Sequence, residues 1–337
     1  MGSLSGSVFE METDAAPERS SARSTVVVTG AAGFIGSRLC EVLLEQGRVV
    51  RGIDALTDYY DRNIKVRNLE ICKSHDRFTW FERDLAVDAI DDIVEGADAV
   101  IHLAAMPGLV RSWTDVASYS RCNVVGTASL LEAVARVAPV ARVIHVSTSS
   151  VYGLEATGDE TSSLKPSSPY GITKLAAEQL VAAYRDHFGL EAVVLRYFSV
   201  YGPRQRPDMA YNIFCRLLLE GAEIPLFGDG SAVRTNTYVD DCVAGTIGAM
   251  DRARSGETYN LGGGVAITVN EAIALLSEVS GRPAKVKRFE PRRGDQLVTV
   301  ANFSKATRHF GYQPAVAPVE GLAKQWEWHL AQTSSRS

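Results

Sequence analysis

The sequence predicts an α/β protein, with a Rossmann-like doubly wound parallel sheet and a smaller C-terminal α/β lobe that binds the substrate. Three observations support this fold class. Short β-branched runs alternate with longer helical patterns from Thr25 onward, which is typical of a parallel sheet covered on both faces. The runs are apolar almost throughout, as strands buried on both faces require. A glycine-rich turn, GAAGFIG, follows the first run and precedes the first helical pattern.

The strands and helices follow one another in a regular order as far as about Gly202. Apolar and β-branched runs predict strands at 25–30, 49–54, 78–85, 97–105, 141–147 and 191–198. Helical patterns occupy 34–46, a stretch within 118–138, and about 170–187. Prolines and the turn FGDG at 227–230 then interrupt the chain. The remainder therefore predicts mixed short elements.

Composition and charge argue against several classes of protein. The 337 residues are 46% hydrophobic, which is enough for a large core, and the formal net charge is −5. Proteins that bind nucleic acid or anionic membranes usually carry a basic surface, so we expect neither partner. No apolar run approaches the roughly 18 residues of a membrane helix. The cysteines and histidines are scattered without ligand spacing, so we expect a cytoplasmic protein with reduced thiols and no bound metal.

The glycine-rich turn has the features of a dinucleotide site. Gly30, Gly33 and Gly36 stand where the backbone must turn sharply and approach a pyrophosphate, whose charge lies at the helix N-terminus. The spacing is Gly-x-x-Gly-x-x-Gly, whereas many dehydrogenases have Gly-x-Gly-x-x-Gly. Asp54 ends the second strand and can bond an adenosine ribose diol while repelling a 2′-phosphate. The pattern favours NAD over NADP; the alternative is a glycine turn without a cofactor.

A cluster of hydroxyls stands where another buried strand ends. The stretch RVIHVSTSSVYG, residues 142–153, carries Ser147, Thr148, Ser149 and Ser150 in a row, with no carboxylate among them. Hydroxyls can donate and accept hydrogen bonds without adding charge. We therefore expect this cluster to hold a sugar at a redox centre.

A tyrosine and a lysine stand four residues apart in SPYGITKLAAEQL. Tyr170 and Lys174 therefore project from one face of the predicted helix. The ammonium and a nicotinamide cation would lower the pKa of the tyrosine from about 10 toward the working pH. Tyr170 could then act as a general base at a sugar hydroxyl. The pair is weak evidence alone, but the glycine turn and the hydroxyl cluster strengthen it.

Several motifs make the sequence resemble the extended short-chain dehydrogenase/reductase superfamily over nearly all of residues 25–330. They are TGAAGFIG, HLAA, STSSVYG, YGITK, YGPRQRPDM, FGDG and YVDD. The resemblance implies that Thr148 bonds the reacting oxygen and Tyr170 is the acid/base. It also implies that Lys174 holds the ribose and tunes the tyrosine. Within the superfamily, VYGPRQRPDMA most resembles the NAD-dependent UDP-glucuronate 4-epimerases.

The same resemblance implies the contacts of NAD. In the family pattern Asn123 supports the active site; the alternative is a helix-capping or surface asparagine. Asp84 and Leu85 follow the third strand and would flank the adenine, although an exposed loop aspartate is the alternative. The cofactor contacts that we expect are Gly30, Gly33, Phe34, Ile35, Gly36, Asp54, Asp84, Leu85, Leu103, Ala104, Ala105, Asn123, Ser147, Tyr170, Lys174, Tyr197 and Val200.

The missing carboxylate limits the reaction. Relatives that dehydrate carry Asp-Glu after the catalytic threonine, and those that decarboxylate UDP-glucuronate carry glutamate two places after it. Ser149 and Ser150 occupy these places. Without an acid to drive elimination, the 4-ketone is expected to be reduced again on its other face, which gives a C4 epimer. Ser149, Ser150 and Ser199 could donate hydrogen bonds to a C6 carboxylate.

The nucleotide half of the substrate needs cations in an otherwise acidic protein. The candidates are Arg206, Arg234 and Arg292, with solvated surface charges as the alternative. The family pattern places Arg234 and Arg292 on the pyrophosphate, Asp295 on the uridine ribose, and Pro225 and Phe227 at the uracil. Two departures from relatives are RTNTYV at 234–239 and Arg111, which falls one residue later than in their Gly-Val-Arg.

These expectations define a function and a division of the chain. The leading function is C4 epimerisation of UDP-glucuronate to UDP-galacturonate, with a hydride passed to and returned from NAD. The alternatives are a UDP-glucose or UDP-N-acetylglucosamine 4-epimerase, a UDP-glucuronate decarboxylase, and a nucleotide-sensing protein without catalysis. Residues 1–24 and 331–337 are expected to be disordered tails. Residues 25–200 should form the NAD-binding Rossmann domain, with some later segments returning to it, and residues 201–330 mainly the nucleotide-sugar-binding lobe.

Two of the predicted helices also suggest self-association. The stretches ASLLEAVARVA and LAAEQLVAAY are apolar on more than one side. The family expectation is a homodimer formed by a bundle of these helices. Packing of the same faces in the core is the alternative.

Overall fold

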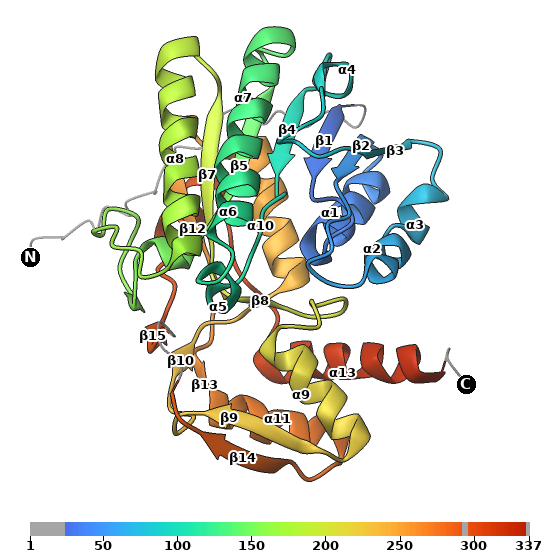
Figure 1. The fold of residues 1–337 in the computed structure, drawn as a ribbon, viewed down its shortest axis with the longest axis vertical. Helices are drawn as coiled ribbons and strands as arrows, with labels where there is room; N and C mark the ends of the chain where they lie inside the picture. Colours follow the sequence, from blue (N-terminus) through green and yellow to red (C-terminus); the bar gives the residue numbers. More distant parts are fainter. Residues whose placement is uncertain (1–23, 292–295, 335–337) are drawn as a thin grey trace, which may run out of the picture.

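The computed structural model describes residues 24–291 and 296–334 (Figure 1). Its central sheet has seven parallel strands in the order β12-β7-β5-β4-β1-β2-β3. These strands are β1 (Thr25–Thr29), β2 (Val49–Asp54), β3 (Phe78–Glu82), β4 (Ala99–His102), β5 (Arg142–Thr148), β7 (Ala192–Tyr197) and β12 (Thr258–Leu261). The direction of winding reverses between β1 and β4, as in a doubly wound sheet. The predicted Rossmann-like fold class is confirmed.

Two predicted strands are shorter in the structure than the sequence indicated. The apolar runs 78–85 and 97–105 continue past the ends of β3 and β4. Leu85, Leu103 and Ala104 leave the sheet and line a cavity at its carboxyl edge. These side chains therefore line the cavity and pack on the neighbouring core without pairing in the sheet. A strand that the sequence reading did not locate, β12, pairs with β7 and completes the sheet.

The helix expected within 118–138 is three consecutive segments. They are α6 (Val116–Ser120), the π-helical turn η1 (Arg121–Val125) and α7 (Gly126–Val137). The wider turn contains Asn123, whose side-chain amide bonds both the backbone N–H and the carbonyl of Met106. Single π-turns inside helices often mark functional sites. Through Asn123, the π-helical turn therefore holds the loop that follows β4 at Met106.

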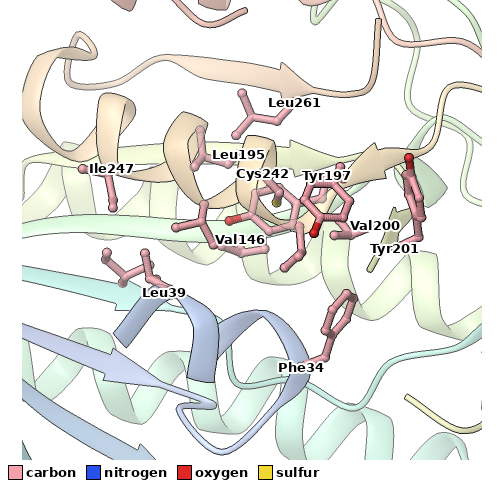
Figure 2. Close-up of a cluster of buried hydrophobic side chains, with 14 of the residues drawn as sticks. Phe34, Leu39, Val146, Leu195, Tyr197, Val200, Tyr201, Cys242, Ile247 and Leu261 are labelled. Atoms are coloured by element: carbon pink, nitrogen blue, oxygen red, sulfur yellow. The ribbon is translucent and has the colours of Figure 1, made fainter. Parts of the chain in front are cut away.

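Helices cover both faces of the sheet. On one face α1 (Phe34–Glu45) and α10 (Val239–Arg252) pack on the alternate side chains Ile144 and Val146 of β5. Figure 2 shows Leu39 of α1 and Ile247 of α10 in this cluster. On the other face α4 (Asp91–Val94), α7 and α8 (Pro169–Phe188) form a second cluster that includes Val143. The two-residue period of β5 thus supplies two separate cores.

The remaining elements lie mostly beyond the carboxyl edge of the sheet (Figure 1). The short strands form a four-stranded sheet, β13-β10-β15-β6, and the two parallel pairs β11-β8 and β14-β9. Their bounds are β6 (Glu155–Ala156), β8 (Val200–Tyr201), β9 (Glu223–Phe227), β10 (Val233–Arg234), β11 (Thr237–Tyr238), β13 (Ile267–Thr268), β14 (Lys285–Phe289) and β15 (Val298–Thr299). The other helices are α2 (Arg62–Asn68), α3 (Glu70–Lys73), α5 (Leu109–Ser112), η2 (Ser149–Val151), α9 (Ala210–Glu220), α11 (Val269–Ser280), α12 (Ser304–Phe310) and α13 (Pro318–Ser334). Across the described ranges, none of the helices has the length and apolar character needed to cross a bilayer.

Candidate active site

A cavity of about 880 Å³ lies along the carboxyl ends of β1, β2, β4, β5 and β7. Open α/β sheets bind ligands at this edge, where the strand order reverses, and the volume is in the upper part of the range for small-molecule sites. Most of the predicted site residues line it: Gly30, Gly33, Phe34, Ile35, Gly36, Asp54, Asp84, Leu85, Leu103, Ala104, Ala105, Ser147, Thr148, Ser149, Ser150, Tyr170, Lys174, Tyr197, Ser199, Val200 and Arg206. Residues from distant parts of the sequence thus share one cavity.

The glycine turn tolerates no side chain at two of its three glycines. Gly30 has φ +70°, and a Cβ there would lie 2.9 Å from the backbone nitrogen of Ala104. A Cβ on Gly36 would lie 2.1 Å from the carbonyl oxygen of Gly30. Gly33 precedes the first residue of α1 and donates its N–H to that same carbonyl, at 3.0 Å. The N-terminus of α1 is therefore held against the cavity with bare backbone, which suits an anionic pyrophosphate.

Asp54, the last residue of β2, is hydrogen-bonded to the glycine-rich turn. Its carboxylate accepts hydrogen bonds from the backbone N–H groups of Ala32, at 3.2 Å, and Leu56, at 2.8 Å. Burial raises the pKa of Asp54, and the nearby Lys65 opposes this effect. The Nζ of Lys65 donates to the carbonyl of Thr57 at 2.8 Å, beside the carboxylate. Asp54 is therefore fixed at the cavity wall and can accept further hydrogen bonds from a ligand.

Tyr170 and Lys174 lie at the start of α8 because the chain signals a helix there. Ser168 caps the helix by accepting a hydrogen bond from the N–H of Gly171 at 3.2 Å, and Pro169 occupies the first turn. The ring of Tyr170 meets Tyr119 edge to face, with 6.2 Å between ring centroids. Both side chains of the pair reach the cavity, as the spacing predicts.

Burial acts on the two groups in opposite senses. It lowers the pKa of Lys174 to about 8, because the ammonium loses its hydration, while Glu178 opposes this change. It raises the pKa of Tyr170, and the hydroxyl of Thr148 and the charge of Arg206 act to lower it. The sequence predicts a net lowering of the Tyr170 pKa, but for a site in which a nicotinamide cation is also bound. It stays a prediction.

The hydroxyl cluster spans the end of β5 and the turn η2. Thr148 Oγ1 donates to Ser150 Oγ at 3.2 Å and accepts from the N–H of Ser150 at the same distance. Ser147 donates to the carboxylate of Glu178. Ser199 is exposed to the cavity between β7 and β8. The sequence reading missed Glu178, although its position four residues after Lys174 places it on the same helix face.

Two guanidinium groups and an aromatic ring also line the cavity. Arg206 donates two hydrogen bonds to Asp208, both 3.0 Å long, and its Cζ lies 5.6 Å from the ring centroid of Tyr59. The Cζ of Arg111 lies 4.8 Å from the same ring. Arg111 therefore lines the cavity despite its displaced position in the sequence. Neither Tyr59 nor Asp208 was foreseen. Asp208 lies within the quoted motif YGPRQRPDM, which was its signal, whereas nothing near Tyr59 in the sequence marks it.

Several predicted residues do not line the cavity. Arg234 donates to the backbone carbonyls of Val233, at 2.9 Å, and Leu297, at 3.2 Å. Phe227, on the same strand as Pro225, stacks on Phe289 with 5.4 Å between ring centroids. Asn123 is fully buried behind the cavity and bonds Met106 and Thr173. Arg292 and Asp295 lie outside the described residues. The cofactor role expected of Asn123 and the substrate roles expected of the other side chains stay predictions.

Comparison with known proteins agrees with this geometry. Residues 26–262 match the model of the NAD dependent epimerase/dehydratase family. A protein of Bacillus subtilis, named an uncharacterized UDP-glucose epimerase, is 39% identical over 89% of this chain and 96% of its own. A UDP-glucuronate 4-epimerase of Thermodesulfobacterium geofontis is 37% identical over 90% of this chain and 95% of its own.

A solved structure is also similar along almost the whole chain. The UDP-glucuronic acid 4-epimerase of Bacillus cereus, in complex with UDP-glucuronic acid and NAD, superposes with a TM-score of 0.89. It is 37% identical, and the match covers 91% of this chain and 99% of that one. The resemblance inferred from the motifs is confirmed. The chain belongs to the NAD dependent epimerase/dehydratase family.

Proposed function

We propose that the protein converts UDP-glucuronate to UDP-galacturonate by NAD-dependent epimerisation at C4. One observation carries this proposal. Thr148, Tyr170 and Lys174 share a cavity with Ser149 and Ser150, which occupy the places where relatives with other chemistry carry acids. The relatives named UDP-glucuronate 4-epimerase support the same substrate.

The residues present fit NAD. The turn at Gly30 and Gly36 leaves no room for a Cβ and offers the N-terminus of α1 to a pyrophosphate. Asp54 is positioned to accept from the two hydroxyls of an adenosine ribose, and its charge disfavours a 2′-phosphate. Lys174 would hold the nicotinamide ribose. When bound, NAD would accept the hydride from C4 of the sugar and return it in the same cycle.

Three side chains move or hold the proton. Thr148 would hydrogen-bond the C4 oxygen, and Tyr170 would take its proton as the sugar is oxidised. Lys174 stabilises the tyrosinate as a nearby cation. After the 4-keto sugar presents its other face, Tyr170 gives the proton back to the C4 oxygen. Proton and hydride both return, so the cycle needs no external oxidant.

The serines would decide the fate of the 4-keto sugar. A uronic acid oxidised at C4 is a β-keto acid that loses carbon dioxide readily. Hydrogen bonds from Ser149, Ser150 and Ser199 would hold its carboxylate in a plane unfavourable for that cleavage. None of the three can protonate or deprotonate C5 as an acid residue would. Rapid return of the hydride then favours the epimer.

The sugar must rotate while the nucleotide stays in place. Arg206 lines the cavity and is a charged donor suited to a phosphate or carboxylate oxygen. Arg234, Arg292, Asp295, Pro225 and Phe227 remain the residues that the family pattern assigns to the uridine and pyrophosphate. A nucleotide held by the C-terminal lobe, with a loosely held hexose, would allow both faces of the ketone to reach the same hydride.

We also propose a cytoplasmic homodimer. Apolar side chains are exposed on or beside the two helices expected at the interface, with Val125 47%, Ile172 55% and Phe188 54% exposed. An intersubunit bundle of α7 and α8 would bury them. Sedimentation velocity of the purified protein tests this arrangement, and a monomer at micromolar concentration would contradict it.

A UDP-glucose 4-epimerase is the second candidate function, because one of the similar proteins is named an uncharacterized UDP-glucose epimerase. Serine hydroxyls can bond a C6 hydroxyl as well as a carboxylate. Steady-state kinetics with UDP-glucuronate, UDP-glucose and UDP-N-acetylglucosamine separates the two. We expect Ser150→Ala to raise KM for UDP-glucuronate by about tenfold and to change KM for UDP-glucose less. Ser74→Ala, at an exposed position just after α3 and outside the cavity, is the matched control. Preferred turnover of UDP-glucose would overturn the carboxylate assignment.

A further inference from the structure

Glu178 is a buried carboxylate that lies beside the catalytic groups and takes no part in the steps above. It follows Lys174 by four residues in α8 and is 5% exposed. It accepts a hydrogen bond from Ser147 and two from Arg196, with Nε–Oε1 and Nη2–Oε2 distances of 3.1 and 2.7 Å. Ser147 and Arg196 are paired in register on β5 and β7. One carboxylate from the catalytic helix therefore joins the carboxyl ends of two strands.

The contacts of Arg196 extend this connection to a third strand. Its Nη1 donates to the hydroxyl of Tyr152 at 2.9 Å, and its Cζ lies 5.0 Å from the centroid of that ring. The Tyr152 hydroxyl donates in turn to Asn260 on β12 at 2.8 Å. Tyr152 closes the turn that begins at Ser149. The network therefore fixes both ends of the hydroxyl cluster relative to α8.

We propose that Glu178 is a positioning residue for epimerisation: it holds the Ser147–Thr148 end of β5 against α8, and it stands one helical turn after Lys174 as the counter-charge of that side chain. The proposal rests on the function proposed above, because Thr148 and Lys174 matter only if they act on the sugar and the ribose. Thr148 directly follows Ser147, so a shift of that strand end moves its hydroxyl away from Tyr170. Displacements of this size at a reacting centre are costly.

The groups around Lys174 make Glu178 its effective counter-charge. On its own helix the neighbours are Tyr170 and Glu178. From β5 and β4 come His145 and His102, whose pKa values burial lowers, to about 3 for His102, so both are neutral near pH 7. From β7 comes Arg196, which is bound to Glu178. Glu178 thus opposes the lowering of the Lys174 pKa to about 8.

The test compares two variants of Glu178 with a matched control. Glu178→Gln removes the charge at nearly constant shape, and Glu178→Asp keeps the charge but withdraws it by one methylene. The control is Asp251→Asn, because Asp251 forms another buried two-bond pair, with Arg48, which directly precedes β2 at the amino end of the sheet. Two quantities are followed below and above pH 8: NAD bound at equilibrium dialysis, and kcat/KM for UDP-glucuronate.

In wild type, NAD binding and kcat/KM should both fall as the pH rises past the pKa of Lys174. In Glu178→Gln we expect the same fall to occur about one pH unit lower. Glu178→Asp should keep the wild-type pH dependence with kcat about tenfold lower. Asp251→Asn should keep both. Wild-type pH dependence in Glu178→Gln, or an equal shift in Asp251→Asn, overturns the charge role. Unchanged kcat in Glu178→Asp overturns the positioning role and decides it even if Glu178→Gln does not fold. An inactive wild type refutes the proposed function, whereas the dialysis still tests Glu178.

Discussion

The cavity has two parts that are built from different kinds of segment. The strand-end part, formed by Gly30, Gly33, Gly36 and Asp54, comes from the turn between β1 and α1, the first residues of α1 and the last residue of β2. The lobe part, formed by Ser199, Arg206 and Asp208, comes from irregular chain beyond β7. Backbone turns depend on local sequence, whereas the lobe part depends on contacts such as those of Arg206 with Asp208 and Tyr59. The first part is therefore predictable from motifs, and the second needs the fold.

The largest effect on turnover should come from removing the hydroxyl of Tyr170. Tyr170→Phe removes one hydroxyl and leaves the ring against Tyr119. We expect kcat to fall by about 10²- to 10⁴-fold with NAD binding unchanged, measured by product formation and equilibrium dialysis. Tyr184→Phe, on the same helix, is the control and should keep full activity. Turnover above a tenth of wild type would show that another group moves the proton.

The strand-end part should respond to a single added methyl. In Gly36→Ala the Cβ meets the carbonyl of Gly30, so we expect about 1–3 kcal/mol less stability and at least about tenfold weaker NAD binding. Thermal melts and dialysis measure the two effects. Gly264→Ala is the control, because its Cβ would meet Pro314 at an ordinary 3.6 Å. Wild-type affinity in Gly36→Ala would mean that NAD does not approach this turn.

The hydroxyl cluster can be tested by restoring the acid that it lacks. Ser150 is buried at the cavity wall, and Ser150→Glu places a carboxylate where decarboxylating relatives carry one. We expect UDP-xylose to rise about tenfold as a share of product, followed by chromatography. Ser74→Glu, at an exposed position just after α3 and outside the cavity, serves as the control. No increase in UDP-xylose would count against protection of the carboxylate by these hydroxyls.

The smallest expected effect is a difference in KM between variants of two arginines, one in the lobe part and one outside the cavity. Arg206→Ala should raise KM for UDP-glucuronate by about tenfold, since a charged hydrogen bond to the substrate is lost. Arg234→Ala should raise it by less, because the Arg234 guanidinium donates to backbone carbonyls. Initial rates over a range of substrate concentration give both values. A larger effect at Arg234 would extend the lobe part to β10 and support the family pattern.

The sequence predicted the elements that depend on local pattern. The apolar runs located β1, β2 and β5, and the capping serine with proline located the start of α8. It did not locate β12, because four residues with mixed polarity carry little signal and the pairing with β7 spans more than 60 residues. It also joined α6 and α7 into one helix, since a π-turn has no distinct hydrophobic period.

The candidate site divides in the same way. Residues at strand ends and in the first turn of α8 were predicted, because parallel strands bring their carboxyl ends to one edge. Glu178 had a usable signal in its four-residue spacing from Lys174, but burial against Arg196 could not be read from spacing. Tyr59 had no signal, since it lies in a loop and meets Arg111 and Arg206 only after folding. Long-range contacts, not residue chemistry, limited the prediction.

One measurement tests the central claim most directly. The purified protein is incubated with UDP-glucuronate without added NAD, and the products are followed by proton NMR. The account predicts that UDP-galacturonate appears, with little UDP-xylose, because NAD stays bound and the carboxylate is protected. No conversion of UDP-glucuronate, with turnover of UDP-glucose or UDP-N-acetylglucosamine instead, would contradict the assignment of Ser149, Ser150 and Ser199 to a carboxylate.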